Sequence, residues 1–184
     1  MKKFPIIALI SAVILAMSSC LKNSEDKATE LWRVHNEEWI DSLAQLKNPD
    51  GTAVYTRVNA KDDAAAFVLM RYLNDRNKTL GNLSPYPTST VHIKYIGRNC
   101  YNEAFDSSYA STDPADSVVA FVPSGLVTGF SIALQDMRVG DSCRVAIPWL
   151  YAYGSSGMGD IPAYSALQFD IKLVDIAHYI EGSN

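Results

Sequence analysis

The sequence predicts an α+β fold, a curved antiparallel half-barrel of five or six strands wrapped around one short helix, with an N-terminal helical extension. Three observations predict it. Apolar residues alternate strictly over residues 166–176, as in a half-buried antiparallel strand. Residues 128–137 have the spacing of a short amphipathic helix, and residues 28–46 repeat that spacing over a longer stretch. The 184 residues suffice for one domain with extensions.

Residues 1–20 are predicted to be a lipoprotein signal peptide. Lys2 and Lys3 precede an apolar run over residues 4–16, which is too short and wrongly flanked for a stable membrane span. The small residues before Cys20 resemble a bacterial lipobox, which implies cleavage there and lipid attachment to the Cys20 sulfur. Attached acyl chains would hold the protein on a membrane. The alternative is a secretory signal that ends at a free cysteine.

The expected location is the cell envelope, with the lipid anchor in the outer membrane on its periplasmic or surface side. Leu21 after the lipidated cysteine resembles an outer-membrane sorting signal. Without Lys2 and Lys3 the chain has 14 basic and 20 acidic residues, a net charge of −6. An acidic domain is repelled by phosphate backbones, so no nucleic-acid partner is expected.

An N-terminal amphipathic helix is predicted over residues 28–47, after a polar tether at residues 21–27. Its apolar face has spacings of three and four residues and consists of Trp32, His35, Trp39, Leu43 and Leu46. Two interpretations remain open. The tryptophans pack on the domain behind them, or the face binds a client or a second copy of the chain as a homodimer.

Residues 48–84 are predicted to form an extension that contributes the first strands, at residues 53–58 and 65–73. In the second strand Phe67, Leu69 and Leu73 share one parity. Residues 74–87 are rich in Asn, Gly and Pro, which predicts a loop. The main domain is expected over residues 85–180. Its strand at residues 90–97 places Tyr95 toward the core or a pocket and His92 toward solvent.

A short helix follows, in which Thr128 is predicted to be the capping residue. Its core face is expected to comprise Phe130, Ala133, Leu134 and Met137. In the next strand Cys143 has the parity of a buried residue. Cys100 lies in a predicted turn, so the two cysteines either form a disulfide or remain free thiols.

The last third of the chain combines an aromatic segment, a glycine-rich loop and a closing strand. Residues 147–154 read Ile-Pro-Trp-Leu-Tyr-Ala-Tyr-Gly, and Gly154, Gly157 and Gly159 punctuate the loop that follows. Glycine lets such a loop fold back over an apolar face where side chains would collide. The loop is therefore expected to wall a small hydrophobic site.

These segments resemble the FKBP-type peptidyl-prolyl isomerases. The resemblance lies in Ile147-Pro148, Tyr151-Ala152-Tyr153-Gly154, Gly157, Ile161-Pro162 and the strand 167–171. Further matching segments precede them in the family's order, at Tyr95-Ile96-Gly97, 105–108, 126–130 and 137–141. Together they cover about ninety residues.

The resemblance implies a proline-binding pocket. It implies catalytic roles for Tyr95, Asp106 and Tyr153, and substrate-binding roles for Phe105, Leu126, Val127, Phe130, Ile161 and Phe169. In the family the residue at Phe130 is usually Trp and forms the floor under the proline ring. The backbone N–H matching Val127 and the hydroxyl matching Tyr153 bind substrate carbonyls. Val119 is a further wall candidate, placed with less support because the preceding spacing suggests an insertion.

The function implied is cis-trans isomerisation of Xaa-Pro bonds in unfolded or exported polypeptides, with macrolides as inhibitors. No cofactor is expected, because the reaction requires no bond to be made or broken. The alternative is a non-catalytic chaperone or binding lipoprotein with the same pocket. His35, His92 and His178 are isolated from one another, so no metal site is predicted. The glycine-rich loop has no lysine and no following helix, unlike a phosphate-binding loop.

Overall fold

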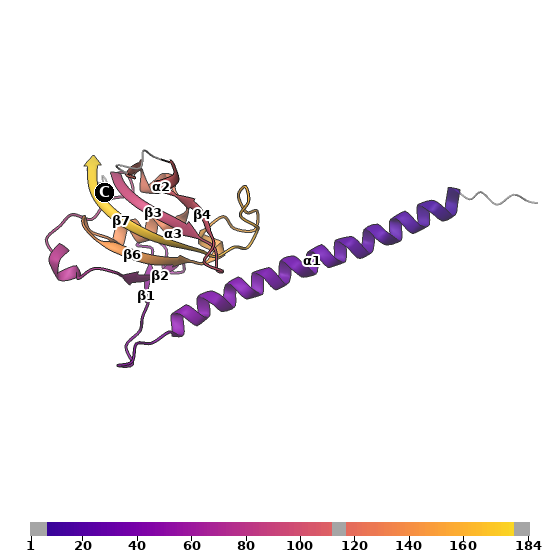
Figure 1. Cartoon of the computed structure of the whole chain (residues 1–184), viewed down its shortest axis with the longest axis horizontal. Coiled ribbons are helices and arrows are strands. Elements are labelled where there is room, and N and C mark those ends of the chain that lie inside the picture. The colour runs from indigo at the N-terminus through magenta and orange to yellow at the C-terminus, as the bar shows by residue number, and fades with distance from the viewer. Residues whose placement is uncertain (1–6, 112–116, 179–184) are drawn as a thin grey trace, which may run out of the picture.

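The computed structural model describes residues 7–111 and 117–178, and it has the predicted α+β architecture. Figure 1 shows a curved sheet wrapped around a short helix, with a long N-terminal helix extending away from it. Neighbouring strands are antiparallel, in the order β1-β2-β6-β7-β3-β4, with β5 also paired to β3. The strands are β1 (Thr56–Asn59), β2 (Phe67–Tyr72), β3 (Thr90–Arg98), β4 (Ala104–Ser107), β5 (Val119–Phe121), β6 (Ser142–Ile147) and β7 (Leu167–His178).

The described sheet therefore has seven strands, where five or six were predicted. β5 has three residues, too few for an alternation pattern to reveal it. β1 and β2 come from the predicted extension and continue the sheet through the pairing of β2 with β6. The sheet remains open, because β1 and β4 lie at opposite ends of the strand order.

The helices are α1 (Ile7–Gln45), α2 (Ser108–Ser111) and α3 (Thr128–Asp136), with short 3-10 turns at Arg76–Thr79, Pro123–Gly125 and Trp149–Tyr151. α1 is continuous through residues 21–27, so the predicted tether is wrong as a structural element. Its polar composition indicated a linker, yet the segment contains neither Gly nor Pro, and its Leu, Lys and Glu residues favour helix. Among the described residues, no helix carries an apolar stretch long enough to cross a bilayer.

The main core lies between α3 and the inner face of the sheet. The predicted helix face is confirmed, since Phe130, Ala133, Leu134 and Met137 are all buried. Gly129 lets α3 approach the sheet closely, because a Cβ there would collide with the Ile147 side chain. The predicted cap is wrong. Val127 occupies the N-cap position without a side-chain hydrogen bond, and Thr128 is the first helical residue.

A second, smaller core lies on the outer face of the sheet, under α1. Leu69 and Ala146 from the sheet pack there with Ile40 of α1, and Trp39 and Leu43 of α1 contact the same cluster. β2 is consequently buried on both faces, since Val68 and Met70 belong to the main core. The predicted parity of Phe67 and Leu69 describes the outer face of β2, which the helix covers.

Asn36 fixes α1 against the sheet. Its side chain is fully buried, its Nδ2 donates to the Trp32 carbonyl oxygen at 2.8 Å, and its Oδ1 accepts from the Ala166 backbone N–H at 2.9 Å. Trp32 Nε1 donates to Ser165 Oγ at 3.1 Å. The interpretation in which the tryptophans pack on the domain therefore describes the structure.

The contacting face of α1 is rotated relative to the prediction. His35 and Leu46 are exposed, whereas Asn36 and Ile40, which the prediction omitted, are buried. His35 instead stacks on Tyr101, with the ring centroids 5.1 Å apart. Hydrophobicity alone could not identify this face, because its central residue is an amide.

Both remaining cysteines within the described residues are free thiols, so no disulfide joins them. Cys143 is buried as predicted, and its burial raises the pKa of its thiol. Cys100 lies half-buried near the β3–β4 turn, and burial raises its thiol pKa also.

Candidate active site

Three aromatic rings form a buried floor where β3, β7 and α3 meet. Phe130 and Phe169 pack edge to face with ring centroids 4.9 Å apart, and the Tyr95 ring lies 6.1 Å from Phe130 and 6.2 Å from Phe169. These separations are typical of favourable aromatic packing. Alternation places Tyr95 and Phe169 on the inner face of adjacent strands, and α3 brings Phe130 against them.

Gly97 provides the space that two of these rings occupy. It pairs with Phe169 across β3 and β7. A Cβ at Gly97 would lie 2.6 Å from Phe169 Cε1 and 2.8 Å from Phe105 Cζ, which is closer than real side chains approach. Phe105 and Phe169 pack edge to face at 5.7 Å. Gly97 therefore determines where both rings lie, a role that the sequence pattern did not reveal.

A rim of half-buried side chains surrounds the floor. The structure brings all the remaining predicted apolar residues against the same core cluster, namely Phe105, Leu126, Val127, Tyr153 and Ile161. Phe121 of β5 was missed. Its ring lies 6.0 Å from that of Tyr95, whereas the wall candidate Val119 packs on the core two residues earlier. The alternation Val119, Ala120, Phe121 was the available signal, but it spans only three residues.

Asp106 and Tyr95 form the polar edge of the site. The Tyr95 hydroxyl donates to Asp106 Oδ2 at 2.7 Å, and the Ser107 backbone N–H donates to Oδ1 at 2.7 Å. Burial raises the pKa of Tyr95 well above its ordinary value, and the hydrogen bond to the Asp106 carboxylate raises it further. Tyr95 is therefore a neutral donor at physiological pH, held in one orientation.

Tyr153 and Val127 offer further donors beside the floor. Burial raises the pKa of Tyr153, and the nearby charge of Asp106 contributes. Within the described residues, its hydroxyl makes no hydrogen bond to the protein. The N–H of Val127, at the N-terminus of α3, likewise has no backbone partner there. Both groups can bind a carbonyl oxygen that enters the site.

The glycine-rich loop folds back as predicted and positions Ile161. Gly157 has a positive φ of 69°, and a Cβ there would collide with the Ile161 carbonyl oxygen. The Met158 N–H donates to Ile161 O at 2.9 Å, and the Ile161 N–H donates back to Met158 O at 2.9 Å. This reciprocal pair closes the loop and sets Ile161 on the rim.

The described residues contain no group of three or more His, Cys, Asp and Glu side chains placed to hold a metal ion. What the site can offer is an apolar aromatic surface with a few oriented hydrogen-bond donors. Such a surface suits recognition of an apolar ring attached to an amide.

A family comparison identifies the class of domain that carries this fold and site. Residues 81–174, about half of the chain, match the model of the FKBP-type peptidyl-prolyl cis-trans isomerase family. The chain therefore belongs to the FKBP-type peptidyl-prolyl cis-trans isomerase family.

Curated relatives share the same region. The macrophage infectivity potentiator of Trypanosoma cruzi is 38% identical over 97 residues, which is 52% of this chain and 47% of that protein. The FKBP-type peptidyl-prolyl cis-trans isomerase FkpA of Escherichia coli K12 is 31% identical over 93 residues, 50% of this chain and 33% of the relative. The matched region thus spans half or less of each of these relatives.

Solved structures extend the likeness to the fold of most of the chain. The crystal structure of FkpA from Escherichia coli matches with a TM-score of 0.70 at 21% identity, covering 97% of this chain and 76% of that one. A peptidyl-prolyl cis-trans isomerase structure from Pseudomonas syringae matches with a TM-score of 0.62 at 24% identity, covering 80% and 95%. At these identities the likeness concerns the fold.

Proposed function

We propose that this protein catalyses cis-trans isomerisation of Xaa-Pro bonds in unfolded polypeptides exported to the bacterial cell envelope. The observation that carries the proposal is the buried floor of Tyr95, Phe130 and Phe169, bordered by the Tyr95–Asp106 hydrogen bond. The family membership of residues 81–174 supports it.

The chemistry demands a shaped site rather than a nucleophile. Rotation about a peptide bond costs roughly 18–20 kcal/mol because resonance is lost, and only Xaa-Pro bonds populate cis appreciably. A catalyst must bind the twisted amide more tightly than either planar form. The twisted amide has less charge separation than the planar amide, so its carbonyl loses less hydration free energy when it leaves water. An apolar aromatic site therefore favours the transition state.

Each residue has a distinct proposed role. Phe130 lies under the proline ring, and Tyr95, Phe105 and Phe169 wall it. The Val127 N–H and the Tyr153 hydroxyl bind substrate carbonyls, while Asp106 acts as a positioning residue that holds Tyr95. Leu126 and Ile161 complete the rim. Macrolide inhibitors are proposed to occupy the same surface.

The test is a protease-coupled proline-isomerisation assay on the soluble form that begins after Cys20. Tyr153→Phe should reduce kcat/KM severalfold, because one carbonyl-binding donor is removed, with a cost near that of one hydrogen bond. Tyr151→Phe is the matched control. Tyr151 belongs to the same segment, but its hydroxyl donates to the Ala65 carbonyl at 2.8 Å, outside the site. A rate equal to buffer, from folded protein, would argue against catalysis.

The second candidate is a binding lipoprotein that uses the same site to hold a partner without turnover. Phe130 favours this second function, because its ring is smaller than the Trp that the family usually has there and contacts less of a proline ring. Removing α1 would not test this cleanly, since Leu69 and Ala146 would become exposed. Peptide affinity measured beside turnover on the intact soluble protein separates the two functions.

Membrane attachment through Cys20 is also proposed. It is supported by the signal-like segment that precedes the cysteine. Cys20→Ser should move the protein from the membrane fraction to the soluble fraction.

A homodimer through α1 would use the side of the helix that faces away from the sheet, where Leu31 is 62% exposed. Light scattering of the soluble form measures its mass directly.

A further inference from the structure

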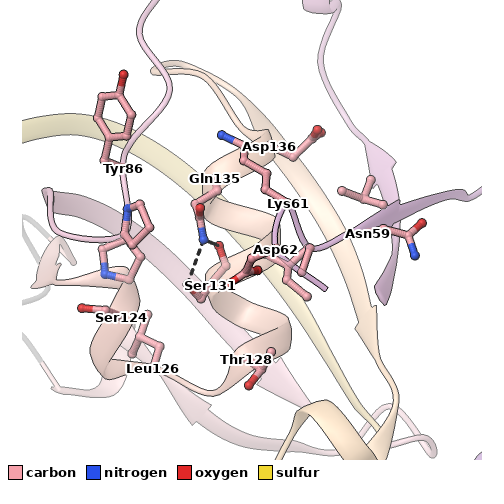
Figure 2. A pocket seen from close by; sticks show the side chains of 15 residues that line it. Asn59, Lys61, Asp62, Tyr86, Ser124, Leu126, Thr128, Ser131, Gln135 and Asp136 are labelled. Carbon is pink, nitrogen blue, oxygen red and sulfur yellow. Dashed lines mark hydrogen bonds between the residues drawn. The ribbon is translucent and has the colours of Figure 1, made fainter. Parts of the chain in front are cut away.

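A groove runs along α3, adjacent to the proposed proline site. It encloses a cavity of about 560 Å³. Its base is the helix face formed by Thr128, Ser131, Ile132 and Gln135, which is offset from the face that carries Phe130. Figure 2 shows Ser131 and Gln135 on α3, with Lys61 and Asp62 close by and Tyr86 and Ser124 on the other side.

The groove and the proline site meet at Leu126. This side chain lines the cavity and also packs against the cluster that contains Tyr95, Phe130 and Phe169. The next residue is Val127, whose N–H is the proposed ligand of a substrate carbonyl. A substrate chain bound at the Val127 N–H therefore lies next to Leu126, which lines the groove.

One wall of the groove comes from outside the family domain. Residues 58–62 line the cavity but precede the matched region, which begins at residue 81. They include the end of β1, the edge strand of the sheet, which pairs only with β2 within the described residues. An edge strand presents backbone groups that an extended polypeptide can pair with.

The lining chemistry suits a polypeptide rather than a phosphate or a lipid. Side-chain hydroxyls of Ser124 and Ser131 and the amide of Gln135 lie among the rings of Pro87 and Pro123. Lys61 contributes a positive charge, whereas Asp62 and Asp136 contribute negative ones, and Asp136 Oδ2 also accepts from the Tyr72 hydroxyl at 2.6 Å. Such a mixture of apolar surface and neutral hydrogen-bonding groups complements a backbone with small side chains, whereas an anion would require net positive charge.

We propose that this groove binds the segment of the substrate chain next to the proline, in extended form. The inference rests on the proposed isomerase function and narrows its substrate class to unfolded polypeptides longer than a few residues. The groove adds affinity for the substrate chain, and the aromatic site catalyses rotation about the Xaa-Pro bond.

The test compares turnover of a short and a long substrate. The short one is a tetrapeptide containing Xaa-Pro, and the long ones extend it on either side to about twelve residues, enough to span a strand-length contact. The substrate extended on the side that enters the groove should have a kcat/KM about tenfold higher than that of the tetrapeptide. This is the effect of roughly one net hydrogen bond. Ser131→Phe, which fills the groove, should abolish that gain and change tetrapeptide turnover by less than about twofold.

Ser131→Ala is the matched control, because it keeps the groove open while removing the hydroxyl that accepts from Gln135 Nε2 at 3.2 Å. Should Ser131→Phe fail to fold by circular dichroism, Gln135→Trp fills the same groove one helical turn later. Equal turnover of short and long substrates by the unmodified protein would overturn the proposal. An equal loss on both substrates in the filled variants would do the same.

Failure of the groove can be distinguished from failure of the isomerase function. If the tetrapeptide is not turned over at all, the proposed function fails. The groove is then tested by the affinity of a proline-free, uncharged peptide of about ten residues, measured by fluorescence anisotropy. Binding that Ser131→Phe abolishes supports the groove, and absence of binding overturns it.

Discussion

The Tyr95 hydroxyl donates a 2.7 Å hydrogen bond to Asp106 Oδ2, linking a nearly buried ring on β3 to an exposed carboxylate on β4. The two strands are antiparallel neighbours, and Asp106 pairs with Gly97, two residues after Tyr95. The bond therefore spans the part of the sheet where the floor meets solvent. The hydrogen bond holds the hydroxyl end of Tyr95, and packing in the core holds the rest of its ring.

Removing this hydrogen bond should affect catalysis more than stability. Tyr95→Phe and Asp106→Ala are each expected to lower kcat/KM severalfold, with a stability loss of about 1 kcal/mol or less, because the site of Asp106 is exposed to water. The double variant should lose little more than either single one, since both remove the same contact. Protease-coupled kinetics and urea denaturation measure the two effects. Fully additive losses would show that the residues act independently.

Gly97→Ala should disturb the floor directly. The new methyl would displace the Phe169 and Phe105 rings, and overpacking of this kind costs roughly 1–3 kcal/mol. Turnover should fall along with the thermal midpoint. Gly125→Ala is the matched control, because a Cβ there meets nothing within 4 Å and its φ is not positive. Equal effects of both substitutions would refute the steric role of Gly97.

Phe130→Trp should test the floor in the opposite direction. A larger ring under the proline is expected to raise kcat/KM about fivefold, which corresponds to about 1 kcal/mol of transition-state binding. Phe130 is only 5% exposed and lies 4.9 Å from Phe169, so the same change should lower stability by roughly 1–3 kcal/mol. Kinetics and denaturation of one purified variant provide both numbers. A gain in stability without a gain in rate would contradict this view of the floor.

Asn36→Ala should loosen α1. The substitution leaves the buried Ala166 N–H without its acceptor, which costs roughly 1–3 kcal/mol. Amide hydrogen exchange should rise along the part of α1 that covers the sheet and at Ala166. Ser42→Ala is the control, because its hydroxyl makes an exposed bond to the Trp39 carbonyl on the same helix. Unchanged exchange in Asn36→Ala would show that apolar packing alone holds the helix.

Stability should fall in alkaline solution. Burial raises the pKa of Tyr72 and Tyr95 above their ordinary value of 10.0, and that of Cys143 above 9.0. The unfolded chain releases these protons at lower pH than the folded chain does, so the free energy of unfolding decreases as pH rises through this range. Urea midpoints at about pH 8 and about pH 10.5 measure the decrease. Tyr72→Phe should make the slope shallower, and an unchanged slope would exclude this residue as a contributor.

The sequence predicted the strands and ring positions of the main domain because they depend on local alternation. Burial alternates over all nine residues of β3 and from Phe169 to Leu173 in β7, which determines the inward faces of Tyr95 and Phe169. The core face of α3 followed from helical spacing for the same reason. The roles of the nine predicted site residues came from family resemblance. Eight of them belong to or pack against the main core cluster and Asp106 bonds to Tyr95, while their roles remain predictions for the assays above.

The remaining features depend on contacts between segments distant in sequence. The buried face of α1 includes Asn36, and only its partner at Ala166, 130 residues away, makes an amide favourable there. Phe121 lies in a strand too short to show a period. The groove along α3 depends on how residues 58–62 approach the helix. No local pattern encodes these relationships.

The link between Asn36 and Ala166 has a mechanical consequence. Ala166 immediately precedes β7, the strand that carries Phe169, so the Asn36 amide, together with the Trp32–Ser165 hydrogen bond, couples α1 to the base of the aromatic floor. A force applied to the N-terminal end of the chain would therefore act at Ala166, three residues before Phe169.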